Sequence, residues 1–288
     1  IAFGSGSGAI NFNQTNSFTL AANVSGAGSL NQLGTGTTIL AGSNSYTGGT
    51  LVSVGTLQGN ATSLQGAISN NALVIFNQTN AGAYSNVISG SGSLTKNGLG
   101  TLTVSGATVT QAAVNLLAGT TVISGAGTLS AGSLTVDQGG TAVITGGSNT
   151  VTGALTVGQT TNTSSSLLVS NEASISASNV FVGAGSSGGN TLTITGSNSL
   201  INNTGNLTIG SATSSNSVVI ANGGQLFSSN TYISDSGAVS NNTVTVTGSN
   251  SLLSNSGVAQ IYGNGTITVA NGGSLQASNV GIGFGGSG

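Results

Sequence analysis

The chain has 288 residues, of which 50 are Gly, and it contains no Pro, Cys, Met, Trp or His. Only four side chains carry a charge, namely Lys96, Asp137, Glu172 and Asp235, whereas roughly a quarter of the residues of an ordinary globular domain are charged. This composition excludes an imidazole base, a thiolate nucleophile, His or Cys metal ligands and a basic surface for nucleic acid. We therefore expect no enzyme, no metal, no cofactor and no nucleic-acid partner.

Hydrophobicity and charge together predict a folded chain. Hydrophobic residues make up 36% of the sequence and the net charge is −2, whereas disordered chains combine low hydrophobicity with high net charge. No apolar run approaches the roughly 18 residues that span a membrane, so we expect no membrane insertion. Because the chain starts at Ile1 without Met or a charged leader, we interpret it as a piece of a longer secreted product.

Residues 1–133 contain a duplicated block. Phe-Asn-Gln-Thr-Asn at 12–16 recurs at 76–80 with all five positions identical. The same offset, from Phe12 to Phe76, places Val-Ser-Gly-Ala-Gly-Ser-Leu at 24–30 on Ile-Ser-Gly-Ser-Gly-Ser-Leu at 88–94. A register kept over both segments indicates a duplication rather than an accident of composition.

Residues 134–288 have a repeat of their own. Thr-Leu-Thr-Ile-Thr-Gly-Ser-Asn-Ser-Leu at 191–200 matches Thr-Val-Thr-Val-Thr-Gly-Ser-Asn-Ser-Leu at 243–252 without a gap. A shorter segment, apolar-x-apolar-Gly, recurs with an average spacing of about 25 residues once its degenerate copies are included. Its copies lie at 155–158, 180–183, 207–210 and 280–283, with degenerate copies at 231–234 and 260–263.

The alternation inside these repeats predicts the fold class. In the segment 191–195 apolar residues alternate with Thr, which is the period of a β-strand, and clusters of Gly, Asn and Ser bound the strands. Short strands that repeat at this close spacing favour a parallel β-solenoid over a β-sandwich, whose strands have no reason to repeat one sequence at one position. We predict an all-β fold, a parallel β-helix (β-solenoid) of about a dozen coils that spans 1–288 as one domain.

Two sets of Asn recur at equivalent positions of the second-half repeat. Stacked in successive coils they would form side-chain amide ladders, and the alternative is that each Asn only takes a left-handed turn conformation. These structural ladder candidates are Asn171, Asn222 and Asn271, and Asn179, Asn230 and Asn279.

The segment 34–57 closely resembles the autotransporter-associated β-strand repeat, which belongs to the passenger regions of bacterial autotransporters and related surface proteins. It reads Gly-Thr-Gly-Thr-Thr-Ile-Leu-Ala-Gly-Ser-Asn-Ser-Tyr-Thr-Gly-Gly-Thr-Leu-Val-Ser-Val-Gly-Thr-Leu. The segment 88–104, with Lys96, is similar to the first half of such a repeat, and the resemblance extends over about residues 24 to 106. It implies a right-handed parallel β-helix exported to the cell surface, and it supplies no catalytic residue.

Several motifs that carry chemistry in other proteins lack a partner here. Ser236 beside Asp235, and the Gly-x-Ser-x-Gly pattern at 185–189, would need an imidazole to activate the serine, and the chain has no His. The Gly-x-Gly-x-x-Gly pattern at 281–286 has no helix after it to bind phosphate. The three acids are too scattered for a paired-carboxylate site and too few for repeat-borne calcium sites, so we interpret them as turn and surface residues.

Thr arrays are the remaining feature. Alternation predicts that they point outward from the strands, where a flat Thr face suits ice or a crystalline glycan, although Thr is also an ordinary solvent-side strand residue. The arrays are Thr101 and Thr103; Thr191, Thr193 and Thr195; Thr243, Thr245 and Thr247; and Thr266 and Thr268.

A neutral solenoid lacks the charge repulsion that normally keeps β-rich proteins apart. Both ends of the sequence lack an obvious polar cap, which predicts either more of the same chain or head-to-tail stacking with other copies. We therefore expect an extracellular or cell-surface structural protein, a fibre or biofilm matrix component, whose partner is itself. The alternative is an adhesin passenger or stalk that binds a glycan or host surface, and a third is an ice or crystal binder.

Overall fold

The structure is a computed structural model that describes residues 1–4, 6–160, 163–186, 188–234 and 239–283. Within these residues the regular elements are β-strands without any helix, and the strands pair in parallel as a β-solenoid of about 13 turns. The predicted fold class is therefore confirmed. A helix long and apolar enough to cross a membrane is absent from the same residues.

The chain forms two compact units, one of residues 1–115 and 119–131, the other of residues 116–118 and 132–288. Strands β15 (Thr108–Leu116) and β17 (Thr128–Val136) contribute residues to both.

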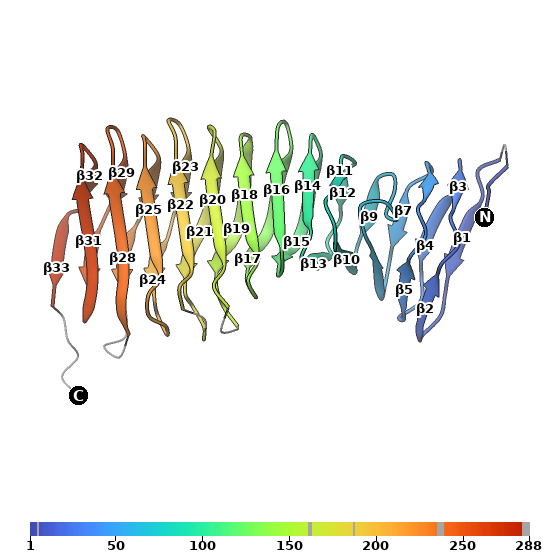
Figure 1. Ribbon diagram of the computed structural model, residues 1–288, viewed down its shortest axis with the longest axis horizontal. Helices are drawn as coiled ribbons and strands as arrows, with labels where there is room; N and C mark the ends of the chain where they lie inside the picture. Colours follow the sequence, from blue (N-terminus) through green and yellow to red (C-terminus); the bar gives the residue numbers. More distant parts are fainter. Residues whose placement is uncertain (5, 161–162, 187, 235–238, 284–288) are drawn as a thin grey trace. The chain divides into compact units, whose positions relative to one another are not determined.

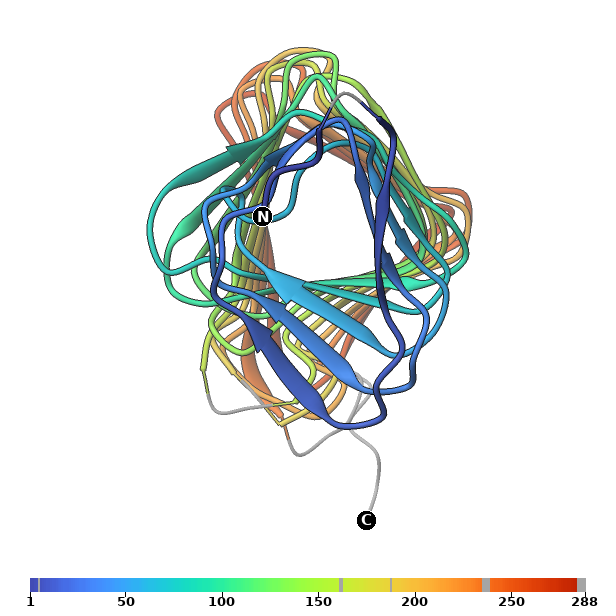
Figure 2. The same ribbon diagram turned by 90° about the vertical axis from the view of Figure 1, so that its right-hand side faces the viewer.

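The first unit has short coils. One ladder joins β1, β4, β7, β9 and β12, and a second joins β2, β5, β8, β10 and β13. In Figure 2 the coils of this unit, blue to cyan, wind around a shared interior, which side chains such as Leu30, Val74 and Phe76 fill. Its strands are β1 (Ala9–Phe12), β2 (Ser17–Leu20), β3 (Ser25–Gly26), β4 (Ser29–Gln32), β5 (Thr37–Leu40), β6 (Ser45–Tyr46), β7 (Thr50–Val52), β8 (Thr56–Gly59), β9 (Ile68–Asn70), β10 (Leu73–Asn77), β11 (Gly82–Tyr84), β12 (Ile88–Ser89), β13 (Ser93–Asn97), β14 (Thr101–Ser105) and β16 (Thr120–Ser124).

The second unit has longer coils, and from β22 onward each turn contributes three strands. The ladders β22–β25–β28–β31, β23–β26–β29–β32 and β24–β27–β30–β33 form the three sides of these turns. Its strands are β18 (Thr141–Thr145), β19 (Ser148–Val157), β20 (Ser166–Ser170), β21 (Ser174–Val182), β22 (Thr191–Thr195), β23 (Leu200–Asn203), β24 (Asn206–Ile209), β25 (Ser217–Ala221), β26 (Gln225–Ser228), β27 (Asn230–Ile233), β28 (Ser240–Thr247), β29 (Leu252–Asn255), β30 (Val258–Ile261), β31 (Asn264–Ala270), β32 (Ser274–Gln276) and β33 (Asn279–Ile282).

The core consists of apolar ladders. Successive side chains of a strand point to opposite faces, so every second residue enters the interior. Leu192, Val218 and Val244 are register partners on β22, β25 and β28, and all three are fully buried. Each contributes about 1.5–3 kcal/mol to folding through the burial of its side chain. Figure 1 shows these strands side by side in the second unit.

Candidate functional site

The acidic residues lie in separate turns. Asp137 follows β17 and is only 1% exposed, whereas Glu172 follows β20 and is exposed with a left-handed backbone (φ 63°). Asp235, with the Ser236 motif around it, lies outside the described residues, as do Ser187 and Gly286 of the two glycine-rich patterns. Among the residues that the structure describes, no group of three His, Cys, Asp or Glu side chains is placed to hold a metal ion.

The carboxylate of Asp137 is bound by hydrogen bonds from residues that follow β19. Its Oδ1 accepts the backbone N–H of Gln159 at 2.9 Å, and Oδ2 accepts the hydroxyl of Thr160 and its backbone N–H at 3.1 Å. Burial raises the pKa of Asp137, but the hydrogen bonds from the Thr160 hydroxyl and from the N–H groups of Gln159, Thr160 and Gln138 together lower it below its usual value. The carboxylate thus stays ionised and fixes Gln159 and Thr160, which come shortly after β19.

Lys96 is also buried, with 1% of its surface exposed. Its Nζ donates to the carbonyl oxygens of Gly98 and Gly100, at 2.7 and 2.6 Å. Burial lowers the pKa of Lys96 to about 8. Gln32, at the equivalent position of the first copy, makes the same contacts, because its Nε2 donates to the carbonyl oxygens of Gly34 and Gly36. Lys96 is therefore a substitute for an amide in the second copy of the duplicated block.

The predicted outward position of the Thr arrays is confirmed. In β22 the burial pattern alternates between partly exposed Thr and buried Leu192 and Ile194, and β28 repeats it over Thr243–Thr247. Stacking in register turns the arrays into columns, such as Thr191 paired with Ser217 and Ser217 with Thr243.

Asn171, Asn222 and Asn271 directly follow the strands of this sheet and have positive φ angles of 54°, 53° and 49°. They occupy alternate coils, because Gly196 and Gly248 stand at the same corner in the coils between them. The side chains reach back by one coil: Asn222 Nδ2 donates to Thr195 Oγ1, and Asn271 Nδ2 to Thr247 Oγ1, each at 3.1 Å. The structure thus places these Asn in left-handed turns.

Asn179 and Asn230 belong to a second corner, where Asn206 stands between them. Asn179 Oδ1 accepts the backbone N–H of Asn206 at 3.0 Å, and Asn230 Nδ2 donates to Asn206 Oδ1 at 3.0 Å. Asn230 Oδ1 then accepts the N–H of Val258, whose register partner is Asn279. Amide groups therefore connect successive coils at this corner.

The most regular polar column was missed by the sequence analysis. Asn190, Asn216 and Asn242, which we call the buried amide ladder, precede the core positions of β22, β25 and β28 and are fully buried. Asn190 Nδ2 donates to Asn216 Oδ1, and Asn216 Nδ2 to Asn242 Oδ1, each at 2.9 Å. Each of these oxygens also accepts the backbone N–H of the preceding Asn, at 3.1 and 2.9 Å.

The buried amide ladder explains the Gly in three copies of the apolar-x-apolar-Gly segment, at 155–158, 180–183 and 207–210. A Cβ at Gly158, Gly183 or Gly210 would lie within 2.1–2.5 Å of the side chain of Asn190, Asn216 or Asn242, respectively. All three glycines also have positive φ, between 69° and 78°. The Gly at the end of the segment therefore leaves space for an Asn of the next coil.

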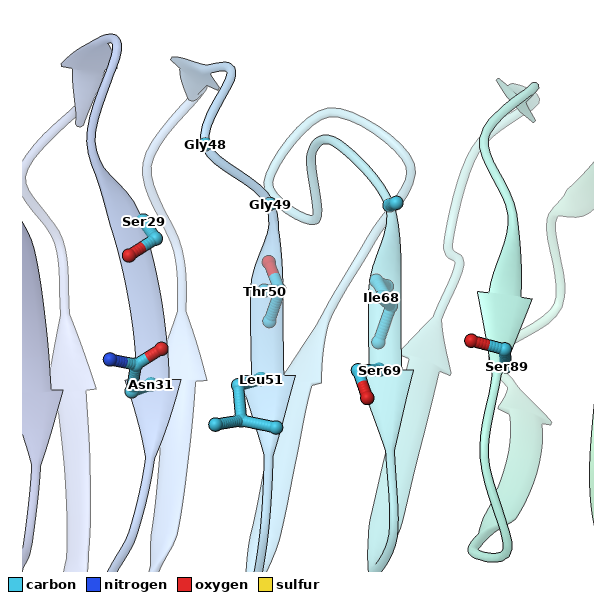
Figure 3. A pocket seen from close by; sticks show the side chains of 10 residues that line it. Ser29, Asn31, Gly48, Gly49, Thr50, Leu51, Ile68, Ser69 and Ser89 are labelled. Carbon is cyan, nitrogen blue, oxygen red and sulfur yellow. The ribbon is translucent and has the colours of Figure 1, made fainter. Parts of the chain in front are cut away.

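Surface depressions are shallow. Figure 3 shows one of about 330 Å³ in the first unit, across β4, β7, β9 and β12, where Leu51 is flanked by its register partners Asn31 and Ser69. A second, of about 370 Å³, lies in the second unit around Phe227, flanked by Asn202 and Ser254. Neither is lined by a titratable side chain, so their chemistry is limited to apolar contact and neutral hydrogen bonds.

Together these features define a parallel β-solenoid with buried amide columns, in which Glu172 is the one exposed charged side chain among the described residues. Residues 30–58, from β4 to β8, match the family model described as passenger-associated-transport-repeat, and this confirms the predicted autotransporter-associated repeat. No curated protein and no solved structure matches the chain. The repeat and the fold fit an autotransporter passenger-like repeat protein, and the repeat suggests a secreted or surface location.

Proposed function

We propose that the chain is an extracellular structural element, a segment of a β-solenoid fibre or cell-surface matrix, that associates with further copies of itself or continues in a longer repeat protein. The observation that carries this proposal is the neutrality of the surface. Of the charged side chains in the described residues, Lys96 and Asp137 are 1% exposed, so that Glu172 alone stands in solvent.

Because Lys96 and Asp137 are buried, the surface carries even fewer charges than the composition indicates. Soluble β-rich proteins use charged side chains to prevent association between sheets. Here about half of the small number of charges lies inside the coils. Solenoids of this kind approach one another without electrostatic repulsion, and hydroxyl and amide side chains on their faces supply neutral hydrogen bonds.

Electron microscopy and sedimentation of the purified chain over a range of concentrations test the proposal. We expect filaments or bundles that grow with concentration and do not depend on salt, because no charges need screening. Lys introduced at the exposed Ser69 and Ser89 should disperse them at low salt, whereas Asn at the same positions should not. Monodisperse particles at every concentration would contradict self-association.

An adhesin passenger or stalk is the second candidate, and the passenger-associated repeat at residues 30–58 favours it. A stalk carries a binding surface outward without needing lateral association. A screen against glycans and host-cell surfaces separates the two functions, since a pure scaffold shows no saturable ligand. Protease accessibility of the chain on intact producing cells tests the surface location that both functions require.

A further inference from the structure

One face of the second unit is a regular array of side chains without charge. Strands β18, β20, β22, β25, β28 and β31 pair in register, and each presents three residues outward. We call these residues the threonine face. Its first column is Thr141, Ser166, Thr191, Ser217, Thr243 and Thr266; its centre column is Val143, Leu168, Thr193, Val219, Thr245 and Thr268; its third column is Thr145, Ser170, Thr195, Ala221, Thr247 and Ala270.

The columns differ in chemistry. All six residues of the first column carry a hydroxyl, whereas every residue of the centre column presents methyl groups. In the first column Ser166 Oγ donates to Thr141 Oγ1, and Thr243 Oγ1 to Ser217 Oγ, each at 3.2 Å. A hydroxyl has one donor and two acceptor positions, so these groups retain capacity for a ligand. The face is a methyl-rich stripe, in which Thr193, Thr245 and Thr268 also carry a hydroxyl, with a hydroxyl column on one side and a mostly hydroxyl column on the other.

The dimensions follow from strand geometry. Neighbouring strands are about 4.8 Å apart, so the stripe is about 24 Å long over six strands, and each flanking column lies about 7 Å from the centre. The Asn side chains at the left-handed corner fix two hydroxyls of the third column, because Asn222 and Asn271 donate to Thr195 and Thr247. The paired strands hold the columns in register, so the backbone under the array needs no ordering when a ligand binds.

We propose that the threonine face binds a neutral, linear polysaccharide in a flat extended ribbon, with the chain of sugars lying along the centre column. The rings of such a ribbon have apolar C–H faces and hydroxyls at their edges. The methyl groups of the centre column cover the ring faces, and the two flanking columns hydrogen-bond the edges. The absence of charge from the face excludes recognition of a polyanion. This binding is separate from self-association and does not depend on it.

Other ligands of the threonine face would make other contacts. Ice presents water molecules alone to every column, so it gains nothing from a methyl-rich centre between hydroxyl flanks. A second copy of the chain would place one methyl-rich stripe on another. The contact over six short strands would be smaller than the roughly 800 Å² per partner of a standard interface. The difference between the columns therefore favours the polysaccharide.

Depletion of the purified chain by microcrystalline cellulose tests the proposal, with granular amylose, an α-linked glucan that coils, as the matched probe. Below the concentration at which any filaments form, we expect saturable binding to cellulose, insensitive to salt, and none to amylose. Val219→Lys places an extended charged chain on the centre column and should lower the partition coefficient roughly tenfold, which corresponds to about 1.4 kcal/mol. Val219→Thr should bind as the parent does, because the neighbouring Thr193 and Thr245 already have that side chain.

Asn202→Lys is the control, since it adds the same charge at an exposed position on β23, outside the threonine face. It should leave binding within roughly twofold. If Val219→Lys does not fold, the triple variant Thr191→Ala, Ser217→Ala and Thr243→Ala removes three hydroxyls of the first column and should weaken binding severalfold. No binding to cellulose, equal binding to amylose, equal effects of Val219→Lys and Asn202→Lys, or thermal hysteresis in place of cellulose binding would each overturn the proposal.

Discussion

The two units build the same fold from coils of different length. In the first unit Ala9 pairs with Ser29, and hydrogen-bonded side chains of neighbouring coils are 20 residues apart, as for Asn31 and Asn11. In the second unit Thr191 pairs with Ser217, and the members of the buried amide ladder are 26 residues apart. The longer coil has longer strands, since β22, β23 and β24 have 5, 4 and 4 residues against 4, 4 and 2 in β1, β2 and β3, and the rest of its extra residues lie between the strands.

The two units also differ in the side chains that bond their buried backbone groups. In the short coils one long side chain, Gln32 or Lys96, bonds two carbonyl oxygens of the turn that follows its own strand. In the long coils Asn side chains bond the backbone and the amide of the neighbouring coil. The first unit also has buried bonds between coils, for instance the N–H of Val24 donating to Asn44 Oδ1, so what sets the second unit apart is the continuous amide-to-amide column.

The largest difference between the units should come from one substitution made at two glycines. Gly183→Ala in the second unit places a Cβ 2.3 Å from Asn216 Nδ2 at a φ of +77°, whereas Gly106→Ala in the first has a φ of +70° and meets nothing within 4 Å. We expect Gly183→Ala to lower the free energy of unfolding by about 4 kcal/mol and Gly106→Ala by about 1 kcal/mol, since the second has only the cost of the left-handed backbone. Denaturant unfolding checks both, and equal losses would contradict the steric role of the ladder.

Removal of one ladder amide should have the next largest effect. Asn216→Ala deletes the acceptor of two Asn190 donors and the donor to Asn242 Oδ1 inside the core. We expect a loss of about 3 kcal/mol, because buried polar groups left without a partner each cost about 1–3 kcal/mol. The exposed Asn202→Ala should change stability by less than about 0.5 kcal/mol.

Hydrogen exchange along the full chain locates the damage. Protection should fall in β22, β25 and β28 of the Asn216→Ala variant, because the ladder connects these coils. Gln32→Ala should instead lower protection mainly within its own coil, near Gly34, Gly36 and Thr38, whose hydroxyl donates to Gln32 Oε1. Loss of protection confined to one coil in both variants would show that the two units do not differ in this respect.

Strand identity was predictable from the sequence because alternation is a local property. The period of two in segments such as 191–195 places Leu192 and Ile194 inside and Thr outside, as the structure has them. The left-handed corner was also predictable, since Asn and Gly tolerate positive φ. The sequence left open whether Asn222 is a turn residue or part of a side-chain ladder. The handedness of the coils stays an inference from the resemblance.

Contacts between coils were harder to predict from the sequence, because they depend on the length of each turn. The duplicated block illustrates this, since β1 and β10 are equivalent strands of its two copies and each pairs with the strand one coil later, β4 and β13 respectively. Yet β10 stacks on β8, in the ladder that β2 begins. The offset between the two copies is not a whole number of coils, so the same sequence occupies another side of the turn.

The buried residues show the same limit. The burial of Lys96 contradicts the usual surface position of Lys, and its match to Gln32 in the duplication was the available signal. The recurrence of Asn at 190, 216 and 242, each 26 residues apart, was visible too, but its role appears only when coils are stacked.

Acid should affect the second unit through Asp137. Its folded-state pKa lies below the ordinary value of 3.8, so the stabilisation is present above that pH and is lost as the pH falls through the folded pKa. Asp137→Asn removes the charge that the loop N–H groups and the Thr160 hydroxyl bond, and it should cost about 2 kcal/mol at neutral pH. Unfolding measured between pH 5 and pH 2 should show a steep loss in the parent and a shallower one in the variant.

Alkali should affect the first unit, and by the smallest amount. Burial lowers the pKa of Lys96 from 10.5 to about 8, so the unfolded state binds more protons between these values, and stability rises as the pH increases above about 8. Burial raises the pKa values of Tyr46 and Tyr84 above 10, so their contribution to stability falls at still higher pH and the rise in stability ends near pH 10.

Lys96→Gln should change stability at pH 7 by no more than about 1 kcal/mol, because Gln32 satisfies the equivalent carbonyls with an amide. It should also abolish the rise between pH 8 and pH 10 in the exchange protection of β13 and β14, while the second unit stays unchanged. If protection still rises between pH 8 and pH 10 in the Lys96→Gln variant, another group causes the effect. Lys96 would then not be a replacement for a buried amide.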